Sequence, residues 1–432
     1  MNEEESMKRR KNLCFQGAAL LLIAITVLLA PGAGAQSKYK TLHRFKGGKD
    51  AEGAYASLIF DQKGNLYGTE AGGGNQNNGT VFKLTPNADG SWTESVLYTF
   101  CSLSHCADGA FPTASLIFDG TGNLYGTAYA GGANGLGTVF KLAPNAHGSW
   151  TESVLHTFTG GTDGGFPWAS LIFDQMGNLY GTTYGGADDL GTVFKLTPNA
   201  DGSWTESVLH NFTGGADGAN PYASLIFDQA GNLYGTTSEG GDGSSCPYQH
   251  CGVVFELMPN GNGTWTESVL HRFKGGEDGG FPYAGLIFDQ AGNLYGTTEV
   301  GGNRVCLDGC GVVFELTRQD DGSWAESLPY SFSDRDGRYP LAGLISDTAG
   351  NLYGTTNLGG DRSLCGGTGC GVVFKLVPNS NGKWTETVLH RFLDRPGAGP
   401  YAGLIFDASG NLYGTTVGDV NSTHGSVFEI TP

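Results

Sequence analysis

Short apolar segments separated by polar, glycine-rich turns recur along most of the chain. In one stretch, the apolar run Ala169–Phe173 is followed by the turn Asp174–Asn178, in which the aspartate can cap the turn and the glycine can adopt a positive φ. Three further runs follow between similar turns, at Leu179–Thr183, Thr192–Leu196 and Trp204–Phe212. Runs of this length and composition are typical of β-strands, so the stretch predicts four antiparallel strands.

This four-strand pattern occurs seven times. Its most regular part, Gly-Asn-Leu-Tyr-Gly-Thr, begins at Gly64, Gly122, Gly177, Gly231, Gly292, Gly350 and Gly410. Repeats of this size made of short strands are typical of propellers. We therefore predict an all-β fold for residues 36–432, a seven-bladed β-propeller of four-stranded antiparallel blades. A linear solenoid or a row of β-sandwiches is the structural alternative.

The two ends of the repeat region predict how the ring closes. Residues 39–45 match the fourth strand of other copies, such as 269–273, whereas the final segment 426–430 matches a third strand. The N-terminal strand should therefore join the last blade as its outer strand, which removes the open sheet edges of a linear array. The same strand order places two sets of loops on one face, here called the top face: second strand to third, and fourth strand to the next blade.

The first 35 residues differ in composition from the repeats. Basic residues at 8–11 precede an apolar run at 17–30, and Ala33-Gly34-Ala35 offers a small-residue cleavage site. This order predicts a secretory signal peptide at 1–35. The apolar run is short for a membrane span, so an uncleaved anchor is the alternative. We expect a secreted or extracellular protein, with the periplasm as another location and no membrane insertion after cleavage.

Charge and composition exclude several classes of protein. The formal net charge is −18, and no basic cluster follows the leader, so nucleic acid is a poor partner. The 73 glycines follow no three-residue period, which excludes collagen. The sequence also has no nucleophile elbow, zinc-protease motif, phosphate loop or dinucleotide fingerprint. We expect a monomer without a cofactor, and leave open whether it is an enzyme.

Eight cysteines follow the leader in four close pairs. The pairs are Cys101 with Cys106, Cys246 with Cys251, Cys306 with Cys310, and Cys365 with Cys370. Close pairs in an exported chain predict four local disulfides. Metal binding is the alternative, because His105 and His250 directly precede a cysteine. Neither other pair has such a histidine and no Cys-x-x-Cys spacing is present, so we expect no metal.

Three of these pairs lie in the second-to-third-strand loops of blades 4, 5 and 6, which are longer than those of the other blades. Cross-linked loops on a rigid scaffold lose less entropy on binding a partner. We call this region the raised sector; neutral insertion is the alternative. Its candidate ligand-binding residues are Tyr248, His250, Arg304, Asp308, Asp361 and Arg362.

An aromatic residue stands just before the first strand in five copies. These residues are Tyr55, Trp168, Tyr222, Tyr283 and Tyr401, with Thr113 and Leu341 in the other two copies. Near the mouth of a central channel, such rings could stack on sugars, and Trp168, Tyr222 and Tyr283 are further ligand-binding candidates. Packing between blades is the alternative explanation.

Two further repeated polar positions have a structural explanation. Carboxylates recur on the top face at Asp50, Asp108, Asp163, Asp217, Asp278 and Asp336. They could act as acid and base or bind Ca²⁺, but repeated carboxylates have like environments, so we favour a turn-forming role. Histidines at positions 43, 156, 210, 271 and 390 are replaced by Tyr98 and Tyr330 elsewhere, an exchange that a catalytic base would not tolerate.

The segments SLIFDxxGNLYGTT, GTVFKLxP, WTESVLHxF and GGxDGxxP together resemble the Gloeo-Verruco (GloVer) extracellular tandem repeat, over Tyr39–Pro432. The resemblance implies an exported bacterial surface or secreted protein whose biochemical role is undefined. Our leading hypothesis is a scaffold that binds a protein or glycan through its top-face loops. The alternative is an extracellular lyase or hydrolase acting on polysaccharide or a small molecule at the channel mouth. A structural surface component is the third hypothesis.

Overall fold

The structure is a computed structural model that describes residues 37–48, 51–186, 190–241, 251–393, 397–418 and 424–432. The predicted signal peptide lies outside these residues. Ser37–Pro432 form one compact unit, in which the described residues contain β-strands and short 3₁₀ turns but no α-helix.

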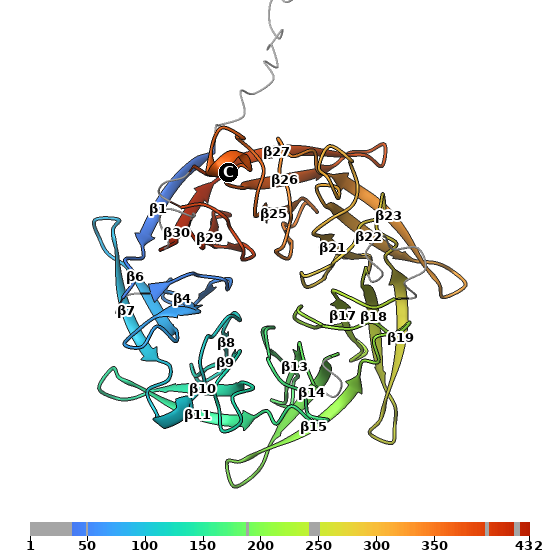
Figure 1. The fold of residues 1–432 in the computed structure, drawn as a ribbon. Coiled ribbons are helices and arrows are strands. Elements are labelled where there is room, and N and C mark those ends of the chain that lie inside the picture. Colours follow the sequence, from blue (N-terminus) through green and yellow to red (C-terminus); the bar gives the residue numbers. More distant parts are fainter. Residues whose placement is uncertain (1–36, 49–50, 187–189, 242–250, 394–396, 419–423) are drawn as a thin grey trace, which may run out of the picture. The chain divides into compact units, whose positions relative to one another are not determined.

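Seven four-stranded antiparallel sheets stand around a ring (Figure 1). Blade 1 contains β3 (Ile59–Phe60), β4 (Leu66–Glu70), β6 (Thr80–Pro86) and β7 (Trp92–Thr99). Blade 2 contains β8 (Ile117–Phe118), β9 (Leu124–Ala128), β10 (Thr138–Pro144) and β11 (Trp150–Thr157). Blade 3 contains β12 (Ile172–Phe173), β13 (Leu179–Thr183), β14 (Thr192–Pro198) and β15 (Trp204–Asn211). Each of these three blades runs in chain order from the centre of the ring to its edge. The predicted propeller is confirmed, and the solenoid and sandwich alternatives are excluded.

The remaining blades repeat this arrangement. Blade 4 contains β16 (Ile226–Phe227), β17 (Leu233–Thr237), β18 (Val253–Pro259) and β19 (Trp265–Arg272), and blade 5 contains β20 (Ile287–Phe288), β21 (Leu294–Thr298), β22 (Val312–Arg318) and β23 (Trp324–Ser331). Blade 6 contains β24 (Ile345–Ser346), β25 (Leu352–Thr356), β26 (Val372–Pro378) and β27 (Trp384–Arg391). Blade 7 contains β28 (Ile405–Phe406), β29 (Leu412–Thr416), β30 (Ser426–Thr431) and β1 (Lys38–Arg44). A small additional ladder pairs β2 (Ala51–Glu52) with β5 (Gly72–Gly73) on the top face of blade 1.

The ring closes as the sequence predicts. β1 pairs antiparallel with β30, with Tyr39 opposite Ile430 and Thr41 opposite Phe428, and the two strands lie side by side in Figure 1. Blade 7 therefore consists of one strand from the N-terminal end of the ring and three from its C-terminal end. The Thr415 hydroxyl then bonds the carbonyl of Ala56 in blade 1 (3.2 Å). Bonds of this kind link the other blades, so the closing junction resembles the rest of the ring.

The innermost strands are shorter than predicted. The pattern at 169–173 predicted a five-residue strand, but β12 contains only its last two residues. The preceding backbone bonds to a neighbouring blade instead: the N–H of Ser170 donates to the Ser224 hydroxyl (3.1 Å), and the N–H of Ser115 donates to the Ser170 hydroxyl (2.9 Å). These contacts line the centre of the ring with bonds between blades.

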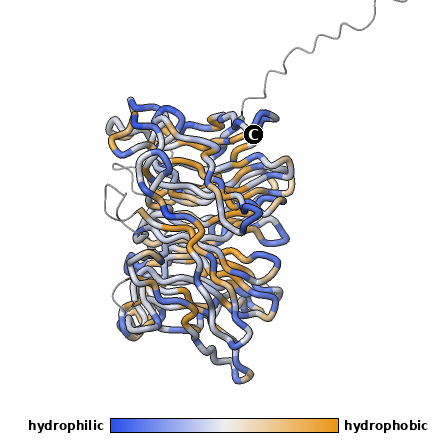
Figure 2. Tube along the Cα trace, turned by 90° about the vertical axis from the view of Figure 1, so that its right-hand side faces the viewer, coloured by the Kyte–Doolittle hydropathy of each residue, from blue (hydrophilic) through white to orange (hydrophobic). Residues whose placement is uncertain are grey.

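Apolar side chains of neighbouring blades form seven buried clusters. In one cluster, Tyr125 and Phe158 of blade 2 pack against Leu171 and Phe194 of blade 3. Trp204 of the outer strand lies 6.3 Å from the Tyr125 ring, as expected for a packing residue. Figure 2 shows that hydrophilic positions predominate in the projecting loops and that hydrophobic positions are concentrated on the inner parts of the trace. Burial between blades thus holds the ring together.

Candidate binding site at the channel mouth

A cavity of about 290 Å³ lies at the top of the central channel. Every blade contributes the short segment that precedes its first strand. The aromatic positions predicted from the repeats all line it, together with the two replacements: Tyr55, Thr113, Trp168, Tyr222, Tyr283, Leu341 and Tyr401. The structure therefore brings these residues together from distant parts of the chain.

Three of the lining rings form a continuous row. Trp168 lies 5.7 Å from Tyr222, which lies 5.1 Å from Tyr283, all in edge-to-face arrangements. Two rings from the top-face loops support the row: Tyr129 lies 5.2 Å from Trp168, and Tyr184 lies 4.7 Å from Tyr222. We call Trp168, Tyr222 and Tyr283 the aromatic arc. The three side chains are only partly buried, so each retains a surface that a ligand can contact.

The backbone that carries the arc has an unusual conformation. The residue two positions before each arc aromatic has a positive φ, as at Phe166 (57°) and Phe281 (55°), which is rare for bulky residues. Hydrogen bonds hold it there: Phe166 N–H donates to the carbonyl of Leu136 in the preceding blade (2.7 Å), and its carbonyl accepts from Tyr184 N–H (3.1 Å). A proline follows each of these residues. This local strain places every arc residue at the channel rather than in a blade.

One charged side chain lines the cavity among the described residues, Glu299. It follows β21, at the position that Tyr129 and Tyr184 occupy in blades 2 and 3. Burial raises the pKa of Glu299, Arg338 opposes this rise and Asp308 adds to it. Sequence reasoning missed Glu299, although a comparison of the copies could have found it, because the residue after the second strand differs in almost every blade.

The candidates of the raised sector do not join the cavity lining. Tyr248 and His250 lie outside the described residues. Arg304, Asp308, Asp361 and Arg362 are exposed on top-face loops, and the Arg362 guanidinium contacts Asp334 at 3.2 Å. Of the four candidates that the structure describes, Asp308 acts on the channel through its charge on Glu299. These loops therefore form a rim beside the cavity.

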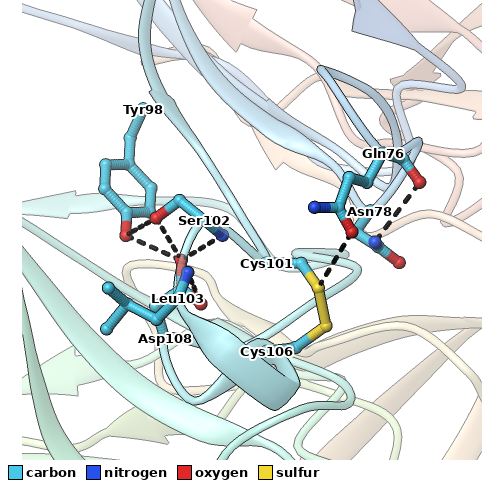
Figure 3. Close-up of a disulfide and its surroundings, with 8 residues drawn as sticks. All are labelled: Gln76, Asn78, Tyr98, Cys101, Ser102, Leu103, Cys106 and Asp108. Carbon is cyan, nitrogen blue, oxygen red and sulfur yellow. Dashed lines mark hydrogen bonds between the residues drawn. A yellow bond between two sulfur atoms is a disulfide. The ribbon is translucent and has the colours of Figure 1, made fainter.

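The structure contains three of the predicted disulfides, Cys101–Cys106, Cys306–Cys310 and Cys365–Cys370. Cys246, and with it the fourth pair, lies outside the described residues. Figure 3 shows the first bridge beside Asp108, whose carboxylate accepts hydrogen bonds from the Tyr98 hydroxyl (2.8 Å) and from Ser102 N–H (2.9 Å). The bridge and this network fix the connection from blade 1 to blade 2.

The repeated top-face aspartates form turns, as predicted. Asp163 accepts hydrogen bonds from the N–H (2.9 Å) and the hydroxyl (2.5 Å) of Thr159, and its carboxylate lies 3.5 Å from His156. Asp108, Asp217, Asp278 and Asp336 also accept bonds from their own loops; Asp50 lies outside the described residues. They stand at the junctions between blades rather than forming an open ring of carboxylates.

These junctions predict a pH optimum for stability. Burial and a neighbouring aspartate raise the pKa of Glu206 and of Glu267 to about 7 from 4.5, so their stabilising contribution is complete below pH 4.5 and is lost as the pH rises through 7. Burial lowers the pKa of His390 to about 4 from 6.5, so its contribution is lost as the pH falls through 4. Because two glutamates lose stabilisation over the range in which one histidine gains it, we expect the melting temperature to be highest near pH 4.5 and to fall towards pH 7. Replacement of both glutamates by glutamine should reduce the fall in melting temperature as the pH rises through 7 and leave the fall at acid pH as it is. An unchanged pH profile of the melting temperature would contradict this assignment.

Seven antiparallel blades with matching sequence repeats define a tandem-repeat β-propeller. The chain belongs to the Gloeobacter/Verrucomicrobia repeat family, whose sequence model matches residues 31–248 and 244–432. Family membership agrees with the resemblance seen in the sequence and supports a repeat scaffold. A comparison with curated proteins gives no match.

Proposed function

We propose that the protein is an exported scaffold that binds a glycan at the channel mouth. The observation that carries this proposal is the aromatic arc of Trp168, Tyr222 and Tyr283. Apolar ring faces pack on the C–H faces of sugars, and Glu299 can accept hydrogen bonds from their hydroxyl groups. The cavity of about 290 Å³ lies near the lower end of the volumes of small-molecule sites. It suits a terminal sugar or a short branch rather than a long polymer segment.

A glycan array with the purified protein, followed by titration of the best ligand, tests this proposal. Trp168→Ala and Tyr222→Ala should each weaken binding about tenfold, equivalent to about 1.4 kcal/mol, because each removes a stacking surface. Arg362→Ala, on the exposed rim, is the control and should bind normally. Loss of binding in the rim variant with normal binding in both arc variants would contradict the role of the arc and favour glycan binding at the raised sector.

Export is part of the same proposal. The predicted leader and the disulfides support it, since disulfides persist in oxidising compartments. In the described part of the chain, no helix is long and apolar enough to cross a membrane. Expression of the full-length sequence in a bacterial host, with N-terminal sequencing of the exported product, should find Gln36 as the first residue. Retention of residues 1–35 on the exported chain would favour an anchor.

The enzyme alternative rests on Glu299, the charged group that breaks the symmetry of the lining. A carboxyl group with a raised pKa can serve as a general acid in a lyase or hydrolase acting on polysaccharide or a small molecule. An activity screen on the same ligands distinguishes the two functions. Glu299→Gln should abolish turnover and retain binding if the protein is an enzyme; ligands that stay intact with the native protein would favour the scaffold.

A further inference from the structure

At the junction between blades 4 and 5, three potential metal ligands meet at the outer part of the ring. His271 lies on β19, Asp278 lies in the loop that follows it, and Glu326 lies on β23 of the next blade. Nε2 of His271 is 3.5 Å from Oε1 of Glu326 and 3.8 Å from Oδ2 of Asp278. One ligand atom from each residue lies within 4.8 Å of the others. The three side chains are 15–18% exposed, so an ion could reach them from solvent.

The loop sequence explains why this junction differs from its neighbours. In blade 2, Thr159 binds both oxygens of Asp163, one through its N–H and one through its hydroxyl. Lys274 occupies the equivalent position beside Asp278 and has no hydroxyl. Only its N–H reaches the Asp278 carboxylate, at 3.1 and 3.3 Å. The threonine clamp is therefore missing at the one place where histidine, aspartate and glutamate converge in the described residues.

Two atoms of the cluster are buried without a hydrogen-bond partner, Nε2 of His271 and Oε1 of Glu326. Leaving such groups unsatisfied is costly, and two nearby carboxylates add mutual repulsion. A cation would satisfy both atoms and offset the negative charge. The exposed Lys274 side chain carries a positive charge on the same loop, but Nε2 of His271 receives no hydrogen bond from it.

We propose that His271, Asp278 and Glu326 bind a divalent transition-metal ion, with Zn²⁺ as the first choice. One imidazole and two carboxylates suit this ion, and its bonds of about 2.0–2.2 Å place tetrahedral ligands about 3.3–3.5 Å apart. The two separations from the imidazole need to shrink by at most a few tenths of an ångström. The carboxylate oxygens of Asp278 and Glu326, which lie within 4.8 Å of each other, would have to approach by up to about 1.3 Å. The ion would cross-link blades 4 and 5, because its ligands come from both. This role is structural and independent of the glycan proposed at the channel mouth.

Titration of the chelator-treated protein with Zn²⁺ alone tests the proposal. Calorimetry should show saturable uptake of about one ion per chain, and Zn²⁺ should raise the melting temperature, because a ligand of the native state stabilises it. His271→Tyr and Glu326→Gln should each weaken the affinity by at least about tenfold. Tyrosine already stands at this position in two other copies, at Tyr98 and Tyr330, so the variant should fold.

His210→Tyr at the junction between blades 3 and 4 is the matched control. There Thr213 retains its hydroxyl bond to Asp217 (2.6 Å), so this variant should bind Zn²⁺ like the native chain. Failure of the native protein to bind Zn²⁺ saturably would overturn the proposal. So would equal weakening in the two tyrosine variants, which would indicate general binding by surface carboxylates.

Discussion

Deletion of residues 37–46 is expected to lower the free energy of unfolding more than a single core substitution such as Gly181→Ala. It removes β1 and leaves the whole length of β30 as an open edge in blade 7. It also removes Phe45, which is 4% exposed and packs 5.3 Å from Phe82 of blade 1. Loss of one buried phenylalanine alone costs about 3–5 kcal/mol. The side chains of Ser37 and Lys40 additionally bond carbonyls of the two flanking blades, at Leu389 and Gly90.

Thermal and urea unfolding of the truncated chain should therefore show a lower midpoint and exposure of apolar surface. A circular permutant provides the control: residues 37–46 are moved behind Pro432 through a copy of the five-residue turn 199–203, which joins β14 to β15. The permutant restores all four strands of blade 7 and should recover most of the stability. An unchanged melting temperature in the truncated chain would contradict closure by β1.

Most of the fold could be predicted from the sequence because the same turn and strand residues recur in seven copies. Each copy of the Asp-x-x-Gly-Asn turn uses the same bonds, as where Asp174 accepts from the N–H of Asn178 at 2.9 Å. The match between residues 39–45 and the fourth strands then gave the closure. The length of the first strand could not be predicted, because the backbone before it forms hydrogen bonds with a neighbouring blade, as at Ser170 and Ser224. The sequence around Ser170 does not indicate which residue of another blade it will contact.

The site was only partly predictable for the same reason. The row of rings at Trp168, Tyr222 and Tyr283 could be predicted because the three residues occupy the same position in successive repeats. Equivalent positions of a propeller face the channel in every blade. Glu299 and the cluster around His271 depend on differences between copies. Lys274 matters because threonine is absent there, and the meeting of His271 with Glu326 depends on the distance between two blades. Repetition predicts the shared structure, whereas departures from it mark the sites.

The second large effect is expected for Gly181→Ala, in the repeated Leu-Tyr-Gly-Thr segment. A Cβ at this glycine would lie 2.6 Å from Cζ of Phe194 and 2.9 Å from a methyl of Leu171. Both residues are 0–1% exposed, and the Phe194 ring packs edge-to-face on Phe158 at 5.2 Å. The ring therefore cannot move aside without disturbing the cluster between blades 2 and 3. Overpacking of this kind costs about 1–3 kcal/mol, measurable as a lower urea midpoint at an unchanged slope.

Two further variants separate steric overlap from a general effect of losing a glycine. Gly120→Ala lies in an exposed turn, without a left-handed φ and with open space around the new methyl group, so its stability should change by less than about 0.5 kcal/mol. Phe194→Leu removes the end of the ring that meets the new methyl, so the double variant Gly181→Ala/Phe194→Leu should lose less stability than the sum of its parts. Simple additivity would show that the glycine is needed for backbone freedom instead. The positive coupling expected here would explain why all seven copies keep a glycine opposite a phenylalanine.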